Sequence, residues 1–141
     1  MTEGTFHRVE ETDKRMYGPR GLVVCGYPPE EHAPLAEFMA RLGGEDLSVI
    51  FVPDEGADRS LEETLALPHR SGEGLPSSLR RAMVLSGFTQ RELHALMAAY
   101  RKAGLPAQLW ATLTPTSESW TVRALLEELA CEAEAMKKNR K

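Results

Sequence analysis

The chain carries one short pattern twice, 61 residues apart. Residues 21–27 are GLVVCGY and residues 82–88 are AMVLSGF, so each is an apolar run that ends in a glycine and an aromatic residue. A helical pattern, a second apolar run and another helical pattern follow each copy, and the two series align without a gap. This self-similarity predicts two β-α-β-α units derived from one by duplication.

The first unit is expected over residues 21–67. Its apolar runs at 21–27 and 47–52 are rich in β-branched residues, which is typical of strands covered on both faces. Between them, apolar residues at helical spacing predict a helix over about 35–43, ended by glycine. A capping-box pattern at 60–63 predicts a short helix after the second strand.

The second unit is expected over residues 82–136. Its strands are predicted at 82–88 and 108–114, and a capping box starts a helix that extends from Gln90 to the glycine at 104. The final helix follows a loop rich in hydroxyl groups. Ser119 is expected to cap it, because a serine oxygen can accept a hydrogen bond from a free N–H of the first turn.

Three segments lie outside these units. Residues 1–20 form a polar arm that is expected to be mobile or loosely docked, and residues 137–141 form a basic tail. Residues 68–81 are rich in proline, glycine and serine, which indicates a linker. Since 141 residues is the size of one ordinary domain, both units are expected to share one core.

Strands that alternate with helices predict a single α/β domain with a four-stranded, mainly parallel sheet in the order 2-1-3-4 and helices on both faces. In such sheets, ligands bind beyond the carboxyl ends of the strands where the winding direction reverses. The predicted crevice therefore lies between the strand that ends at Gly26 and Tyr27 and the strand that ends at Gly87 and Phe88.

Other candidate binding residues lie in loops expected at the same edge. Thr114, Thr116 and Ser117 precede Trp120, and hydroxyls at the start of a helix can bind phosphate. Asp54 follows the second strand, where a carboxylate can bind or transfer protons. The alternative is that the hydroxyls only satisfy the turn, that Asp54 is solvated, and that Trp120 fills core.

Cys25 is the one weak candidate for catalysis. It lies at the end of a strand and before a helix, where its thiol pKa could be lowered, and His32 follows seven residues later. The alternative is a buried, inert thiol. Ser86 is not in a G-x-S-x-G elbow, and no cofactor motif or metal-ligand spacing occurs, so neither a cofactor nor a metal is expected and an enzyme is not favoured.

The overall charge excludes two partner classes. A formal net charge of −4 gives no general attraction to nucleic acid or to an anionic membrane. The sequence also lacks a signal peptide and an apolar stretch long enough to span a bilayer. We therefore expect a cytoplasmic protein that binds neither.

Residues 82–130, in the second half of the chain, carry a set of features that together resemble a known family. These are a glycine-aromatic turn, a helix that ends in glycine, and a threonine-rich loop before a tryptophan and a leucine-rich helix: Gly87, Phe88, Gly104, Thr114, Pro115, Thr116 and Trp120. Together they resemble the small bacterial family known as domain of unknown function 3783. The resemblance implies no known activity.

The leading functional hypothesis is a non-catalytic interaction or regulatory module. Exposed edge strands invite pairing, so the partner is expected to be another protein or a second copy of the chain, bound at a sheet edge or at the loop before Trp120. The first alternative is a small ligand or nucleotide phosphate in the predicted crevice. The second is a thiol-dependent enzyme that uses Cys25.

Overall fold

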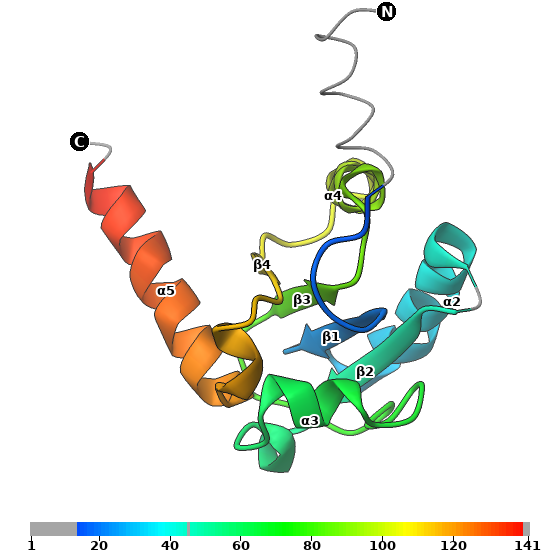
Figure 1. Cartoon of the computed structure of the whole chain (residues 1–141), viewed down its shortest axis with the longest axis horizontal. Coiled ribbons are helices and arrows are strands. Elements are labelled where there is room, and N and C mark those ends of the chain that lie inside the picture. Colours follow the sequence, from blue (N-terminus) through cyan, green and yellow to red (C-terminus); the bar gives the residue numbers. More distant parts are fainter. Residues whose placement is uncertain (1–13, 45, 140–141) are drawn as a thin grey trace, which may run out of the picture.

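The computed structural model describes residues 14–44 and 46–139, and within them one four-stranded sheet with helices on both sides (Figure 1). The strand order is β2-β1-β3-β4, as predicted. The strands are β1 (Gly21–Cys25), β2 (Ser48–Val52), β3 (Ala82–Ser86) and β4 (Leu109–Thr112). The α-helices are α2 (His32–Gly43), α3 (Leu61–Leu65), α4 (Gln90–Lys102) and α5 (Val122–Asn139), and the short 3-10 helices are η1 (Pro29–Glu31), η2 (Asp54–Gly56) and η3 (Ser117–Ser119).

Each face of the sheet forms a separate hydrophobic cluster. Successive side chains of a strand point to opposite faces, so Leu22 and Val24 of β1 pack with α2 and α4, while Val23 packs with α3 and α5. β1 and β3 are buried at every position. This double coverage explains why their sequences are continuous apolar runs with no alternation.

The prediction of a mainly parallel sheet was wrong. β1 is parallel to β2 and β3 is parallel to β4, but β1 and β3 are antiparallel. The cause is the path of the linker between α3 and β3. The linker follows the outer edge of β2, and its residues Leu79 and Arg80 then pass beside Gly26 at the end of β1. The chain therefore enters β3 next to the carboxyl end of β1, with Ala82 opposite Cys25.

The register of the strands relates the two halves by an approximate twofold axis. In the central antiparallel pair, Val23 lies opposite Val84. Gly21 lies opposite Ser48 in the first parallel pair, and Ala82 opposite Leu109 in the second, so both parallel pairs have the same offset.

The same axis relates the starts of α3 and α5. Ser60 and Thr121, which precede these helices, form an isolated antiparallel bridge. Leu61 N–H donates to the carbonyl of Trp120, and Val122 N–H donates to the carbonyl of Arg59. This reciprocal pair of hydrogen bonds joins the two halves on the α3 and α5 face.

Two predicted helix starts are confirmed and one is wrong. Capping boxes start α3 at Ser60 and α4 at Thr89. The cap of α5 is Thr121, whose hydroxyl accepts from Ala124 N–H at 3.0 Å, and not Ser119. Ser119 instead ends η3, and the chain is extended at Trp120 before α5 begins.

The described part of the N-terminal arm is docked. Met16 N–H donates to the carbonyl of Phe88, and Gly87 N–H donates to the carbonyl of Tyr17. Arg20 is largely buried and binds Glu92 of α4 with two hydrogen bonds of 2.8 and 2.6 Å. The expectation of a mobile or loosely docked arm is thus wrong for residues 14–20, and residues 1–13 lie outside the described part of the chain.

Candidate functional site

The predicted crevice between the two glycine-aromatic turns does not form. Because β1 and β3 are antiparallel, Gly26 and Tyr27 lie at one end of the sheet, and Gly87 and Phe88 lie at the other. A Cβ at Gly26 would lie 2.5 Å from the carbonyl oxygen of Leu79, so neighbouring chain already fills the space beside this turn. The two turns therefore do not frame a common ligand site.

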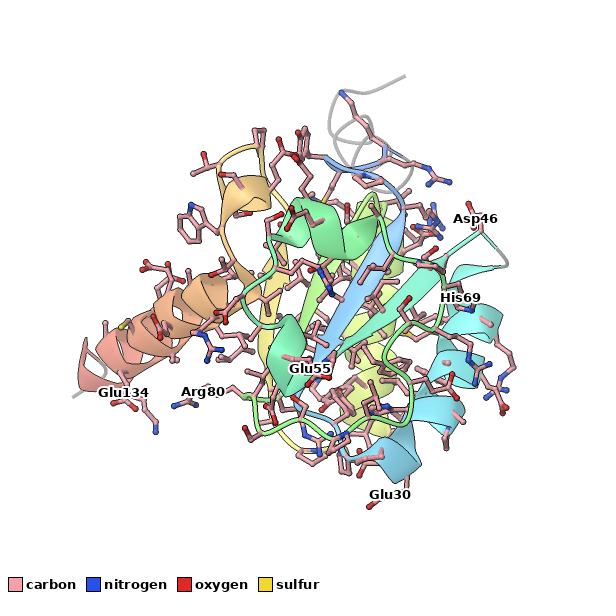
Figure 2. The ribbon with its side chains drawn as sticks, turned by 90° about the horizontal axis from the view of Figure 1, so that it is seen from below. Glu30, Asp46, Glu55, His69, Arg80 and Glu134 are labelled. Atoms are coloured by element: carbon pink, nitrogen blue, oxygen red, sulfur yellow. The ribbon has the colours of Figure 1, made fainter. Side chains whose placement is uncertain are left out.

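Tyr27 and Phe88 are core residues, each 2% exposed. The Tyr27 hydroxyl donates to Gln108 Oε1 at 2.7 Å, and the guanidinium of Arg81 lies 4.2 Å from the centre of its ring. Burial raises the pKa of Tyr27 far above its usual range. Tyr27 also borders a pocket of about 350 Å³ whose lining includes Glu30 and Glu31 (Glu30 is labelled in Figure 2).

Asp54 fixes the linker. Its Oδ1 accepts hydrogen bonds from the backbone N–H and the hydroxyl of Ser78, both at 2.8 Å. The hydrogen bond from the Ser78 N–H, followed by that from its hydroxyl, lowers the pKa of Asp54. Asp54 therefore holds the return path of the chain toward β3, which is a structural task.

Cys25 is buried in an environment that suppresses thiol chemistry. It is 0% exposed, and burial raises its pKa to about 12. His32 does not form a pair with it: His32 Nε2 lies 3.0 Å from the carbonyl oxygen of Tyr27, and Nδ1 accepts from Gly74 N–H at 2.8 Å. Ser86 is also fully buried, and its hydroxyl has no hydrogen-bond partner in the described part of the chain.

The loop before Trp120 uses its hydroxyl groups on itself. Thr114 N–H donates to Ser117 Oγ at 3.1 Å, and Ser117 N–H donates to Thr114 Oγ1 at 3.0 Å. Thr116 is exposed. The predicted anion site thus has two of its three hydroxyl-bearing residues bonded to each other, and Trp120 is half-buried beside the cluster under α5.

A groove along the outer edge of β4 is a concave feature that the sequence did not predict. Its volume is about 540 Å³. We call it the edge groove and define it by the residues of α4, β4 and α5 that line its walls and floor: Leu93, Met97, Trp110, Thr112, Leu129 and Glu132. All four residues of β4 are only half-buried, whereas β1 and β3 are fully buried.

The other edge of the sheet, at β2, is covered by the linker. Val49 N–H donates to Nδ1 of His69 at 3.0 Å, and Arg70 N–H donates to the carbonyl of Val49 at 2.7 Å. Phe51 N–H donates to the carbonyl of Ser71 at 2.8 Å. Figure 2 shows His69 beside β2. The outward backbone groups of Val49 and the N–H of Phe51 are therefore satisfied within the chain.

The helical spacing of Leu93, Met97 and Leu129 in the sequence predicts that these residues fill core, and for this reason the sequence does not predict the groove. A signal that could have indicated the groove is the unequal length of the helices that follow β2 and β4. The first, α3, has five residues, and the second, α5, has 18. After a helix as long as α5, no chain returns in the described residues to cover β4.

No cluster of three or more histidine, cysteine, aspartate or glutamate side chains that could hold a metal occurs among the described residues. None of the described helices has the length and the apolar character to cross a membrane.

Comparison with known proteins finds a family match for the second half of the chain. No curated protein and no solved structure matches the chain. The model of one family, described as Domain of unknown function (DUF3783), matches residues 81–136, which span β3, α4, β4 and most of α5. The second half of this protein therefore matches DUF3783, the family that its sequence resembles.

Proposed function

We propose that the protein is an interaction module that binds an extended segment of polypeptide along the outer edge of β4. The observation that carries this proposal is the contrast between the two edges of the sheet. The edge at β2 is covered by residues 69–71, whereas no segment among the described residues covers the edge at β4, which lies in an apolar groove. A bare edge strand is a template for a further strand.

The direction of the backbone groups of β4 supports this. Leu109 N–H donates to the carbonyl of Arg81, and Leu113 N–H donates to the carbonyl of Leu85. Peptide groups alternate in direction along a strand, so the N–H and carbonyl groups of Trp110 and Thr112 point away from β3. None of these outward groups has a hydrogen-bond partner in the described part of the chain.

The walls of the edge groove suit the side chains of an added strand. Leu93 and Met97 of α4 stand on one side of β4, and Leu129 of α5 stands on the other. An added strand would bury alternate side chains against these two helices, as the other strands of the sheet do. Glu132 would lie at the rim, where its charge keeps contact with solvent.

We also infer that the two halves arose by duplication. The approximate twofold axis and the equal offsets of the two parallel pairs support this. Under the 61-residue offset, Val49 and Phe51 of β2 correspond to Trp110 and Thr112 of β4. The covered positions of one edge thus correspond to the bare positions of the other, and residues 69–71 give a template for the segment that β4 binds.

The proposal is tested by selecting phage-displayed peptides on the immobilised protein and measuring their binding to two variants. Thr112→Pro removes the outward N–H, which an edge strand tolerates, and Thr112→Val keeps the N–H while it replaces the hydroxyl with a methyl group of similar shape. We expect selected peptides to lose binding at least about tenfold on the proline variant and to retain it on the valine variant. Failure to enrich any peptide on a chain that stays monomeric, or equal binding of the selected peptides to both variants, would refute the proposal.

A further inference from the structure

We infer that the edge groove binds a second copy of this chain, with the two β4 strands antiparallel across a twofold axis. This inference rests on the proposed function and names its partner. Two copies of a bare strand can satisfy each other, because a twofold interface places the same surface on both sides.

One register pairs all the outward groups of β4. With Ala111 opposite Ala111 of the second copy, Trp110 lies opposite Thr112 of that copy. The N–H and the carbonyl of Trp110 then exchange hydrogen bonds with those of Thr112 of the second copy, and the twofold axis repeats this pair. A shift of the register by two residues would leave outward groups of Thr112 or Trp110 beyond the partner strand.

The side chains fit this register on both faces. On the α4 face, Trp110 would contact Thr112 of the second copy, and aromatic with β-branched pairs stabilise neighbouring strands. On the α5 face, the small side chains of Ala111 meet at the axis. They leave room for the two α5 helices to approach each other above the joined sheet.

The projecting part of α5 is self-complementary. The helix leaves the body of the molecule beyond β4, and Glu134 lies on the part that projects (Figures 1 and 2). On the side facing the groove, Leu129, Ala133 and Met136 follow helical spacing, and Met136 is 61% exposed. An antiparallel crossing that places Leu129 against Met136 of the second copy also places Glu128 against Lys137 of that copy.

Charge reversal tests this arrangement. Sedimentation velocity over a wide concentration range should show a dimer of the wild-type chain. Glu128→Lys alone and Lys137→Glu alone should each weaken association by about tenfold, and the double variant should restore it. Glu134→Lys is a matched control on the same helix with no assigned partner, and it should leave the dimer unchanged. A double variant that associates as weakly as either single variant would overturn the crossing of α5.

A disulfide tests the register independently. In this register the two Ala111 residues form a non-hydrogen-bonded pair of the antiparallel ladder. The Cα atoms of such a pair are about 4.5 Å apart, within the range that a disulfide spans. Ala111→Cys in a Cys131→Ser background should therefore form a covalent dimer on mild oxidation, while the background alone should not. A wild-type chain that stays monomeric, or an Ala111→Cys variant that does not cross-link, overturns the second copy as partner.

The outcomes separate this inference from the proposed function. If the chain stays monomeric but Thr112-dependent peptides still bind, the groove accepts extended segments and the second copy is the wrong partner. If the chain neither associates nor binds such peptides, both the inference and the proposed function fail.

Discussion

Replacing Arg20 with methionine should destabilise the protein more than replacing any surface arginine. Arg20 has only 9% of its side chain exposed. It binds both carboxylate oxygens of Glu92, and its Nη2 also donates to the carbonyl of Gly43 at the end of α2, at 2.8 Å. One side chain therefore joins the docked arm, α2 and α4. Methionine keeps most of the volume of the aliphatic stem and removes the charge and the donors.

The size of the effect follows from these contacts. A hydrogen bond to a charged group contributes about 1.5–3 kcal/mol, but water can reach Glu92, which keeps 30% of its side chain exposed. We therefore expect Arg20→Met to lower the free energy of unfolding by about 2–3 kcal/mol. For a chain of this size, that lowers Tm by about 7–10 °C.

The assay is chemical unfolding of Arg20→Met, Glu92→Gln and the double variant, analysed as a double-mutant cycle. We expect a coupling free energy of about 1–2 kcal/mol. The exposed pair Arg123 and Asp58, joined at 2.9 Å with 50% and 76% of their side chains exposed, is the control and should show no measurable coupling. Equal coupling in the two pairs would refute the argument from burial.

The pH dependence of the same variants gives a second check. Burial works against the charged form of Glu92, but hydrogen bonds from Arg20 and from the Thr89 N–H outweigh it and lower the pKa of Glu92. A carboxyl whose pKa is lower in the folded state stabilises the fold above its unfolded pKa, and this stabilisation disappears as the pH falls through its folded pKa. The difference in stability between wild type and Arg20→Met should therefore shrink in acid. A difference that stays constant down to the acid transition would contradict the assigned pair.

Two further predictions concern the linker and the thiols. Gly72 and Gly74 both have positive φ, 79° and 85°, but an added Cβ at Gly72 would collide with the β2 backbone, whereas nothing lies within 4 Å at Gly74. Thermal unfolding should show that Gly74→Ala costs about 1 kcal/mol and Gly72→Ala about 3 kcal/mol; equal costs would mean that the linker does not press on β2. Titration with a thiol reagent should label Cys131, which is exposed, and leave Cys25 unlabelled until the protein unfolds; fast labelling that persists in Cys131→Ser would contradict the burial of Cys25.

The positions of the elements could be predicted because they depend on local signals. The β-branched runs mark β1 and β2, and the hydroxyl and glutamate pairs at Ser60 and Thr89 start α3 and α4. The strand order also follows from the alternation of strands with helices along the chain. The signals for the strands and helix starts depend on residues that are close together in the sequence, so the sequence alone is enough to predict these elements.

The direction of β3 could not be predicted, because strands buried on both faces have the same apolar pattern in parallel and antiparallel pairs. Composition identifies residues 68–81 as a linker, but not the route that they take along β2. That route depends on contacts across the sequence, such as His32 with Gly74 and Asp54 with Ser78. The predicted crevice required β1 and β3 to be parallel. Because β3 has the opposite direction, the crevice does not form.

The antiparallel seam between β1 and β3 has a consequence for shorter chains. A polypeptide of residues 81–136, the part that the family model matches, would have in β3 a strand with apolar side chains on both faces and no neighbour in place of β1. If the two halves arose by duplication, as we propose, two such polypeptides should pair with Val84 opposite Val84, because Val23 of β1 lies opposite Val84 in the present register. The same architecture is therefore open to one chain with two units or to two chains with one unit each.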